Sequence, residues 1–435
     1  MRLELADFPV SQIDVADEFR YQSGRLVVGH DELMTLIRQD KRIKDATLAV
    51  TMPGEKIRIT GIRDIVEPRF KVKGNGQVFP GTLTPVEFAG EGRTHRLSGM
   101  AVVATAEYEG TIRAGTAVQR NAILDMWGPG AKLSRFSSLV NLVLILRLET
   151  GLAELEAHTA IQRAEYEVAR RLARMTEGLN PAAIQTYDLD EEDSKLPRFM
   201  LIQGCLTESH HVHSGVSYYG LPLRDSLATF VHPNELLDGA VTVDTLRTGR
   251  GYYPATWDWQ NHPVVFGLYG AHGRKLNFTG VILERIRFET YQGKEVIAQN
   301  TARLAEAMRA DGVIVTWLGG GNAFVDVMLT VRACEQRGIK TVLMTYELGG
   351  QNRVDPPLLH CVPEANAVVS VGTRDLWGEL PAPEKVVGPY DEIKVLSYPG
   401  APPVSVHGPL AFESLDLIMG GVDIWGGESW RCEGY

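Results

Sequence analysis

The chain has 435 residues and a mass of 48.0 kDa, which is long enough for two or three domains with separate cores. It is 44% hydrophobic and 23% charged, with a formal net charge of -10 and no basic cluster, so neither nucleic acid nor a membrane surface is an expected partner. Neither a signal peptide nor a membrane-spanning stretch is predicted, and four dispersed cysteines without a CxxC motif are typical of a reducing compartment. We therefore expect a cytoplasmic protein.

The first 200 residues are predicted to form short strands separated by turns. Runs rich in β-branched or apolar residues lie at residues 25–28, 46–50, 57–60 and 101–104. A short helix is predicted over residues 31–40. A long amphipathic helix is predicted over residues 150–180, where apolar residues follow helical spacing. These patterns predict a β-rich α+β domain over residues 1–200.

From about residue 277 the pattern changes to alternating strand and helix. Strands are predicted at residues 278–283, 312–317, 340–346 and 367–371, and helices at residues 299–310 and 324–337. This alternation predicts a parallel sheet covered on both faces, so we expect an α/β fold with a doubly wound, Rossmann-like domain over residues 277–435. Ligands bind beyond the carboxyl ends of the strands in such sheets, which makes Asn322 and Glu347 candidate substrate-binding residues.

Residues 201–276 are interpreted as a histidine-rich joint between the two domains. His211 and His213 lie on the same side of an extended segment, because alternate strand residues share a face. With His210 and Cys205 they are candidate ligands of a Zn²⁺ or Fe²⁺ site that keeps an open coordination position. General acid/base work fits the same pattern, so His211 and His213 are also predicted catalytic residues, and a purely structural role stays open.

Two polar loops of the N-terminal domain supply further candidates. Glu67 and His95 are predicted to be catalytic, and Arg69 and Arg93 are predicted to bind substrate. The alternative is that these side chains form ion pairs or lie on the surface.

An aromatic group in the joint is a candidate for amine binding. Trp257 and Trp259 lie close in sequence to Tyr252 and Tyr253, and such rings surround cations by cation–π contact. Trp257 and Trp259 are therefore predicted to bind substrate. A buried aromatic cluster at the domain junction explains the same pattern equally well.

Several stretches along nearly the whole chain together carry a family pattern. They include IVEPRFKVKGNGQVFPG, GEGRTHRLSG, DMWGPGAK, HPNELLDGAV, NFTGVIL and RADGVIVTWLGGGN. These stretches resemble the α/β proprotein of component B of the glycine, sarcosine and betaine reductases and, more distantly, the D-proline reductase proprotein. The resemblance implies reductive C–N cleavage of a small amine or related nitrogen compound, or sulfur-transfer chemistry. It also implies a hetero-oligomer with a γ-like component B subunit that carries a reactive cysteine or selenocysteine.

The sequence departs from that pattern where the family proprotein is cut. The resemblance implies a cut before a cysteine, which becomes a pyruvoyl group at the new N-terminus. Here that position falls near Leu246, whose side chain has no heteroatom, although attack by Thr242 or Thr245 remains an alternative. We therefore expect an uncleaved chain without a pyruvoyl group. Because the segment at residues 207–215 adds histidines, a metal acting as a Lewis acid is the expected replacement.

Two other functions stay open at this point. The chain could be a non-catalytic substrate-binding or scaffold subunit whose partner supplies the chemistry, or a stand-alone metal-dependent hydrolase or lyase. Activity of the chain alone would support the hydrolase or lyase.

Overall fold

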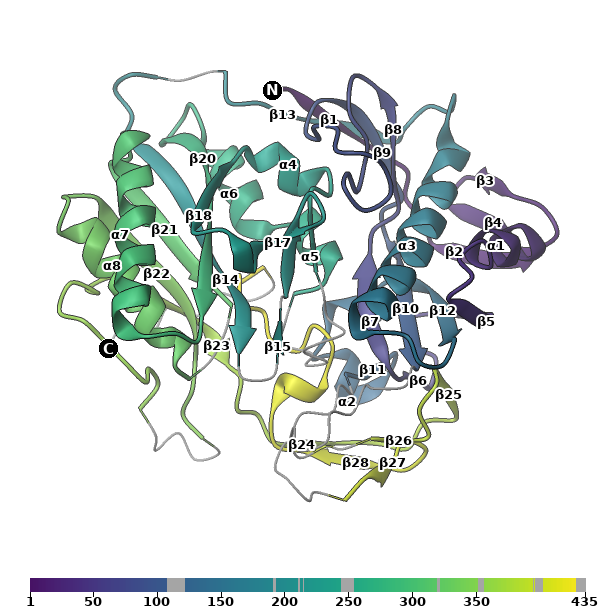
Figure 1. Ribbon diagram of the computed structural model, residues 1–435. Coiled ribbons are helices and arrows are strands. Elements are labelled where there is room, and N and C mark those ends of the chain that lie inside the picture. The colour runs from purple at the N-terminus through teal and green to yellow at the C-terminus, as the bar shows by residue number, and fades with distance from the viewer. Residues whose placement is uncertain are drawn as a thin grey trace.

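Several sheets and a smaller number of helices make up this fold (Figure 1). The structure, a computed structural model, describes residues 1–107, 122–190, 193–209, 212–213, 215–243, 254–318, 321–350, 356–393, 395 and 402–427. The fold is mixed α/β with parallel strands and more strand than helix, which confirms the predicted class in its general form. None of the described helices is both long enough and apolar enough to cross a membrane.

Two four-stranded sheets and one long helix form most of the N-terminal part. Their strands are β1 (Leu3–Asp7), β5 (Ile43–Thr51), β7 (Ile62–Val66), β8 (Arg69–Lys73), β9 (Gly92–Arg96), β10 (Met100–Glu107), β12 (Val140–Leu148) and β13 (Ala183–Tyr187). The strand orders are β13-β1-β9-β8 and β5-β12-β10-β7. Helix α3 (Glu154–Ala173) contacts β10, β8 and β7 through Ala157, Ile161, Val168 and Leu172, which lie on one face. The predicted long helix is therefore confirmed.

Shorter elements complete the N-terminal part. They are β2 (Gln12–Ala16), β3 (Arg20–Gln22), β4 (Arg25–Gly29), α1 (His30–Ile37), β6 (Ile57–Ile59), β11 (Leu124–Asp125), α2 (Gly128–Ala131) and the 3-10 helices η1 (Arg135–Ser138) and η2 (Arg174–Thr176). The strand runs predicted before residue 105 fall in β4, β5, β6 and β10, and the predicted short helix is α1.

The largest sheet has five parallel strands and an antiparallel edge strand. Its strands are β14 (Arg198–Ser209), β18 (Ala228–Val231), β20 (Asn277–Arg287), β21 (Gly312–Trp317), β22 (Lys340–Glu347) and β23 (Val368–Thr373). The order is β18-β20-β14-β21-β22-β23, and β15 (Val212–His213) forms a hairpin with β14. Because β14 lies between β20 and β21, the sheet begins before the expected domain start at residue 277. The histidine-rich joint thus contributes a central strand.

Helices lie on both sides of this sheet. Helices α7 (Tyr291–Ala307) and α8 (Ala323–Glu335) pack against each other on one side, and α4 (Pro233–Leu237), α5 (Thr256–Gln260) and α6 (Pro263–Ala271) lie between the sheet and the N-terminal part (Figure 1). The helix predicted at residues 299–310 starts earlier, because the Thr290 hydroxyl accepts a hydrogen bond from the Gly293 N–H (3.2 Å) and caps α7. In sequence, β16 (Val216–Tyr218), β17 (Leu221–Pro222) and η3 (Leu223–Asp225) precede α4, and β19 (Val241–Val243) follows it; β17, β16 and β19 form a small sheet.

The C-terminal segment returns to the N-terminal part. It contains β24 (Gly378–Leu380), β25 (Lys385–Val387), β26 (Glu392–Ile393), β27 (Val404–Ser405), β28 (Leu410–Phe412) and η4 (Leu415–Leu417), and β25 pairs with β6. The fully buried Arg58 forms an ion pair with Asp125 (2.7 Å) and donates hydrogen bonds to the carbonyls of Val406 and Gly408 (both 2.9 Å). One buried guanidinium thereby fixes the C-terminal segment beneath α2 (Figure 1).

Candidate functional site

The strand order of the parallel sheet defines where a ligand is expected. Chain connectivity reverses direction between β14 and β21, and ligands of open α/β sheets bind beyond the carboxyl ends of strands at such a point. β14 ends at Ser209 and pairs through Glu208 with His213 of β15, so the backbone of Val212 and His213 lies at this edge. His210 and His211 lie outside the described residues. The predicted metal and catalytic roles of the three histidines therefore stay predictions.

A buried polar cluster lies in the middle of this region. The Gln203 side-chain carbonyl accepts hydrogen bonds from the Thr316 hydroxyl and from Trp425 Nε1 (2.8 Å). His262 Nε2 lies 3.4 Å from the same oxygen, and its ring stacks on Trp425 with centroids 3.9 Å apart. Burial lowers the pKa of His262 to about 3, so this imidazole is neutral near pH 7. The cluster thus joins β14, β21, α6 and the C-terminal segment.

Trp425 also lines a pocket of about 280 Å³, which we call the junction pocket. Its lining comes from η1, α5, the start of α6 and the C-terminal segment: Arg135, Ser138, Leu139, Trp257, Asp258, Asn261, Pro263, Asp423, Ile424, Trp425 and Gly427. Arg135 Nε and Asp258 Oδ1 form an ion pair of 2.6 Å. Trp257 Nε1 is buried and has no hydrogen-bond partner among the described residues. Two indole rings and charges of both signs therefore surround one small cavity.

Helix α5 is held from the N-terminal part by a buried ion pair. Arg69 pairs with Glu67 (2.5 Å) and donates hydrogen bonds to the Gln260 carbonyl and to Asn261 Oδ1 (both 3.1 Å). The Gln260 side chain in turn bonds both backbone groups of Glu67 (3.0 and 3.2 Å). The pair thus orients Asn261 toward its place in the pocket lining.

A second buried ion pair holds the segment before residues 244–253. Asp238 accepts hydrogen bonds from Lys71 Nζ, the Gly90 N–H (2.8 Å) and the Thr94 hydroxyl (2.6 Å). Lys71 also donates to the Glu91 carbonyl (2.6 Å), and the Lys71 and Asp238 side chains are 3% and 0% exposed. This network fixes the end of α4 against β8 and β9. Leu246, near which the resemblance implies a cysteine in the family, lies outside the described residues.

A buried network of acidic and hydroxyl side chains holds Val243, the last described residue before residues 244–253. Asp64 Oδ2 accepts hydrogen bonds from the Thr256 hydroxyl (2.5 Å) and the Tyr166 hydroxyl (3.1 Å). The Thr256 hydroxyl accepts one from the Val243 N–H (3.1 Å). Burial raises the pKa of Asp64 to about 7. Glu165 of α3 lies next to Asp64 of β7. Burial and the charge of Asp64 hold the pKa of Glu165 well above its ordinary range.

The other predicted site residues lie in several places. His95 donates or accepts a hydrogen bond with the Thr176 hydroxyl (2.8 Å), packs on Phe8, and has a pKa lowered by burial. Arg93 forms a half-exposed ion pair with Glu4 (2.7 Å). Trp259 is fully buried against Trp425, and Asn322 and Glu347 lie at the carboxyl edge of the sheet, at the start of α8 and the end of β22. Of the predicted substrate-binding residues, only Trp257 lines the junction pocket.

Several pocket residues were not predicted from the sequence. Asn261 follows Trp257 at i+4 and donates to its carbonyl (3.0 Å), so helical spacing from Trp257 was a usable signal. Arg135, Asp423 and Trp425 come from distant segments, and no local pattern points to them.

Within the described part of the chain, no group of three His, Cys, Asp or Glu side chains is arranged to hold a metal. Burial raises the pKa of the Cys205 thiol far above its ordinary value, so a metal there would have to displace a tightly held proton.

Comparison with known proteins identifies the family. A sequence model of the glycine/sarcosine/betaine reductase component B subunits matches residues 1–428. The glycine reductase complex component B subunits alpha and beta of Acetoanaerobium sticklandii are 30% identical over 399 residues, which are 89% of each chain. The sarcosine and betaine reductase complex component B subunits alpha of Peptoclostridium acidaminophilum are each 30% identical, over 406 residues (91% of each chain) and 410 residues (92% of this chain and 90% of the relative). No solved structure matches the chain. These matches confirm the resemblance read from the sequence: the chain belongs to the family of glycine/sarcosine/betaine reductase component B subunits.

Proposed function

We propose that the chain is the substrate-binding subunit of a component B-like reductase complex and holds a small zwitterionic nitrogen compound in the junction pocket. The relatives are named for reductases of glycine, sarcosine and betaine. Each of these compounds has a positively charged nitrogen and a carboxylate near pH 7. The observation that carries the proposal is the junction pocket itself, which combines two indole rings with charges of both signs.

The pocket has a group for each end of such a ligand. Trp257 and Trp425 offer aromatic faces to the ammonium or methylated ammonium group by cation–π contact, and Asp423 adds negative charge. Arg135 offers its guanidinium to the carboxylate of the ligand. The guanidinium would then bind two carboxylates, that of the ligand and that of Asp258. Trp257 Nε1 has no acceptor among the described residues, and a ligand oxygen would supply one.

The chemistry of C–N cleavage also needs a nucleophile for the carbon fragment. Two of the described cysteines are unsuited to this role, because burial raises the pKa of the Cys205 and Cys334 thiols, that of Cys334 to about 12. We propose that a γ-like partner in a hetero-oligomer supplies a reactive cysteine or selenocysteine. This chain would bind the substrate, orient its C–N bond and exclude water.

Replacing Trp257 with alanine tests the substrate site. Losing one cation–π face in a desolvated pocket should weaken binding of betaine or sarcosine by about tenfold, to be measured by calorimetry on the purified chain. Trp257→Phe should retain most of the affinity, and Tyr291→Ala, at a 52% exposed aromatic residue outside the pocket, should retain all of it. Unchanged affinity in Trp257→Ala would place the substrate elsewhere.

We further propose a bound Zn²⁺ or Fe²⁺ at His210, His211 and His213, because their segment follows the carboxyl end of β14 at the sheet edge where ligands bind. The metal would act as a Lewis acid in place of a pyruvoyl group. About one equivalent of metal is expected in the purified protein, and the double variant His211→Ala/His213→Ala should lose it. His30→Ala/His360→Ala is the matched control. Absence of metal from both the free and the partner-bound chain would refute the metal site and leave the substrate pocket to be tested by itself.

A further inference from the structure

We propose that the apolar groove over the paired strands β24 and β28 is the docking site of the partner subunit, which inserts a bulky apolar side chain flanked by lysine or arginine. This inference rests on the proposed function, because it assigns the surface that receives the γ-like subunit.

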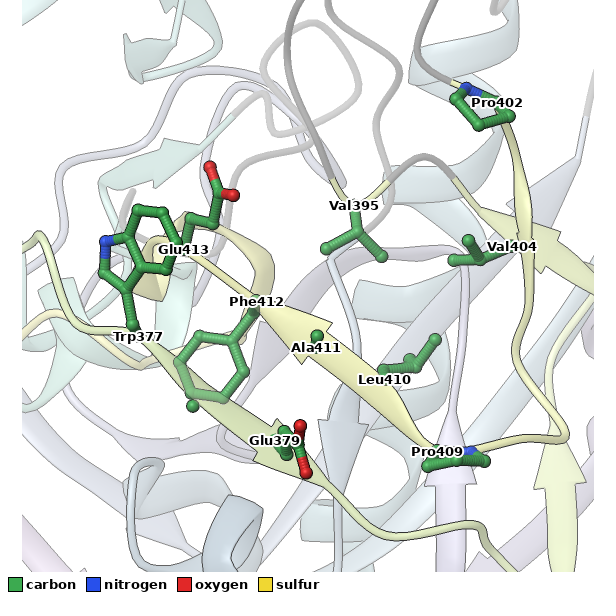
Figure 2. A pocket seen from close by; sticks show the side chains of 11 residues that line it. Trp377, Glu379, Val395, Pro402, Val404, Pro409, Leu410, Ala411, Phe412 and Glu413 are labelled. Atoms are coloured by element: carbon green, nitrogen blue, oxygen red, sulfur yellow. The ribbon is translucent and has the colours of Figure 1, made fainter. Parts of the chain in front are cut away.

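The groove is a separate cavity of about 550 Å³ on the C-terminal segment. Leu410 and Phe412 of β28 are almost fully buried and form its floor, while Trp377 and Val404 are 44% and 36% exposed and stand at its sides (Figure 2). An exposed indole beside a concave apolar surface is unfavourable in water and is typical of an interface that a partner covers. A cavity of about 550 Å³ has room for a large apolar side chain.

The charges around the groove specify the chemistry of the occupant. Glu379 and Glu413 line it beside Phe412, and neither forms an ion pair within the described part of the chain (Figure 2). Between residues 374 and 427 the sequence has eight acidic and three basic side chains. A basic surface is therefore favoured on the partner. A second copy of this chain would bring the same acidic surface and would be repelled.

The position of the groove also suits a subunit that must reach the substrate. β24 packs on α2, and η1 with its pocket residue Arg135 begins five residues after Gly130 of α2, a stretch that spans at most about 18 Å. From the other strand, the chain continues through η4 to Trp425 in the junction pocket. A partner seated in the groove would thus rest on strands that connect to the junction pocket through α2 and η4.

Binding of the purified γ-like subunit to groove variants of the full chain tests this inference. Trp377→Ser and Val404→Asp should each raise the Kd by about thirtyfold, as expected for a central interface residue. The charge reversal Glu379→Lys/Glu413→Lys should slow association and weaken its dependence on salt. The matched controls are Val86→Asp, at a 65% exposed valine, and Asp31→Lys, at a 96% exposed aspartate side chain. Unchanged thermal unfolding should accompany each variant.

The outcomes separate this inference from the proposed function. Equal Kd values for the wild type, Trp377→Ser and Val404→Asp would overturn the docking site and leave the partner in place. Failure of the wild type to bind the γ-like subunit would overturn both. Self-association that Val404→Asp abolishes in sedimentation would assign the groove to a second copy instead.

Discussion

Replacing Asp238 with alanine is expected to lower the free energy of unfolding by about 3–5 kcal/mol, the cost of removing one partner of a buried ion pair. The reason is that Lys71 would keep its charge in a site where its side chain is 3% exposed. The Gly90 N–H and the Thr94 hydroxyl would also lose their acceptor. Urea unfolding, followed by circular dichroism, measures the change.

Two further variants show whether the charge itself causes this loss. Lys71→Met/Asp238→Leu removes both charges and should recover much of the stability, because a buried pair contributes little net free energy relative to apolar groups. Asp225→Ala removes a carboxylate that is 71% exposed and should change stability by less than about 0.5 kcal/mol. A double variant as unstable as Asp238→Ala would contradict the ion-pair explanation and assign the loss to the Gly90 N–H and the Thr94 hydroxyl, which lack their acceptor in both variants.

Local patterns predicted individual elements well, because those patterns depend on neighbours in sequence. The strand predicted at residues 312–317 is β21, and the predicted strand at residues 340–346 is β22 with one further residue. Helix α3 was predicted because its apolar residues recur at helical spacing and face the sheets. In each case the apolar pattern that accompanies burial lies within a short window of sequence.

Long-range pairing could not be predicted in the same way. β14 begins with the apolar run at residues 199–202, but nothing in that run places it between β20 and β21. Glu67 and Arg69 were interpreted as loop residues with possible functional roles, whereas they form a buried pair whose partners Gln260 and Asn261 lie almost two hundred residues away. The ion-paired alternative for Arg69 was correct, and only the tertiary fold could decide it.

In the candidate site, too, residues with a local sequence signal were predicted and residues brought in by the tertiary fold were not. Trp257 was predicted from a local cluster of aromatic residues, and it lines the junction pocket. Its neighbour Trp259 has the same local signal but is fully buried, because it lies on the other side of α5 against Trp425. Trp425 contributes to the pocket from near the end of the chain, where no local pattern marks it as a pocket residue.

The buried carboxyl groups of Asp64 and Glu165 predict a pH-dependent stability. Glu165 Oε1 accepts a hydrogen bond from the Ala104 N–H (3.3 Å), and Oε2 has no partner among the described residues. Ala104 pairs with Asp64 between β10 and β7, which brings the two carboxyl groups together. No basic side chain of the described residues forms an ion pair with either. The folded protein therefore holds a proton on Glu165 that the unfolded chain releases near its ordinary pKa of 4.5.

Glu165→Gln should therefore stabilise the protein at pH 8 while changing little at pH 5. Because the pKa of Glu165 is raised on folding, its contribution to stability is fully present below about pH 4.5 and is lost as pH rises. Glutamine imitates the protonated acid and has no proton to release, so the gain should grow with pH by up to about 1.4 kcal/mol per unit. Urea unfolding between pH 5 and pH 8 measures this difference.

The surface residue Glu167 provides the control on the same helix. Its carboxylate forms a half-exposed ion pair with Arg170 (2.6 Å), so Glu167→Gln should leave the pH dependence of the wild type unchanged. If Glu165→Gln ran parallel to the wild type at every pH, Glu165 would be ionised in the folded protein and would need a cation beside it. If Glu165→Gln gains stability with pH as expected, α3 holds a neutral acid beside Asp64, whose hydrogen bond with Thr256 leads on to Val243 at the end of β19.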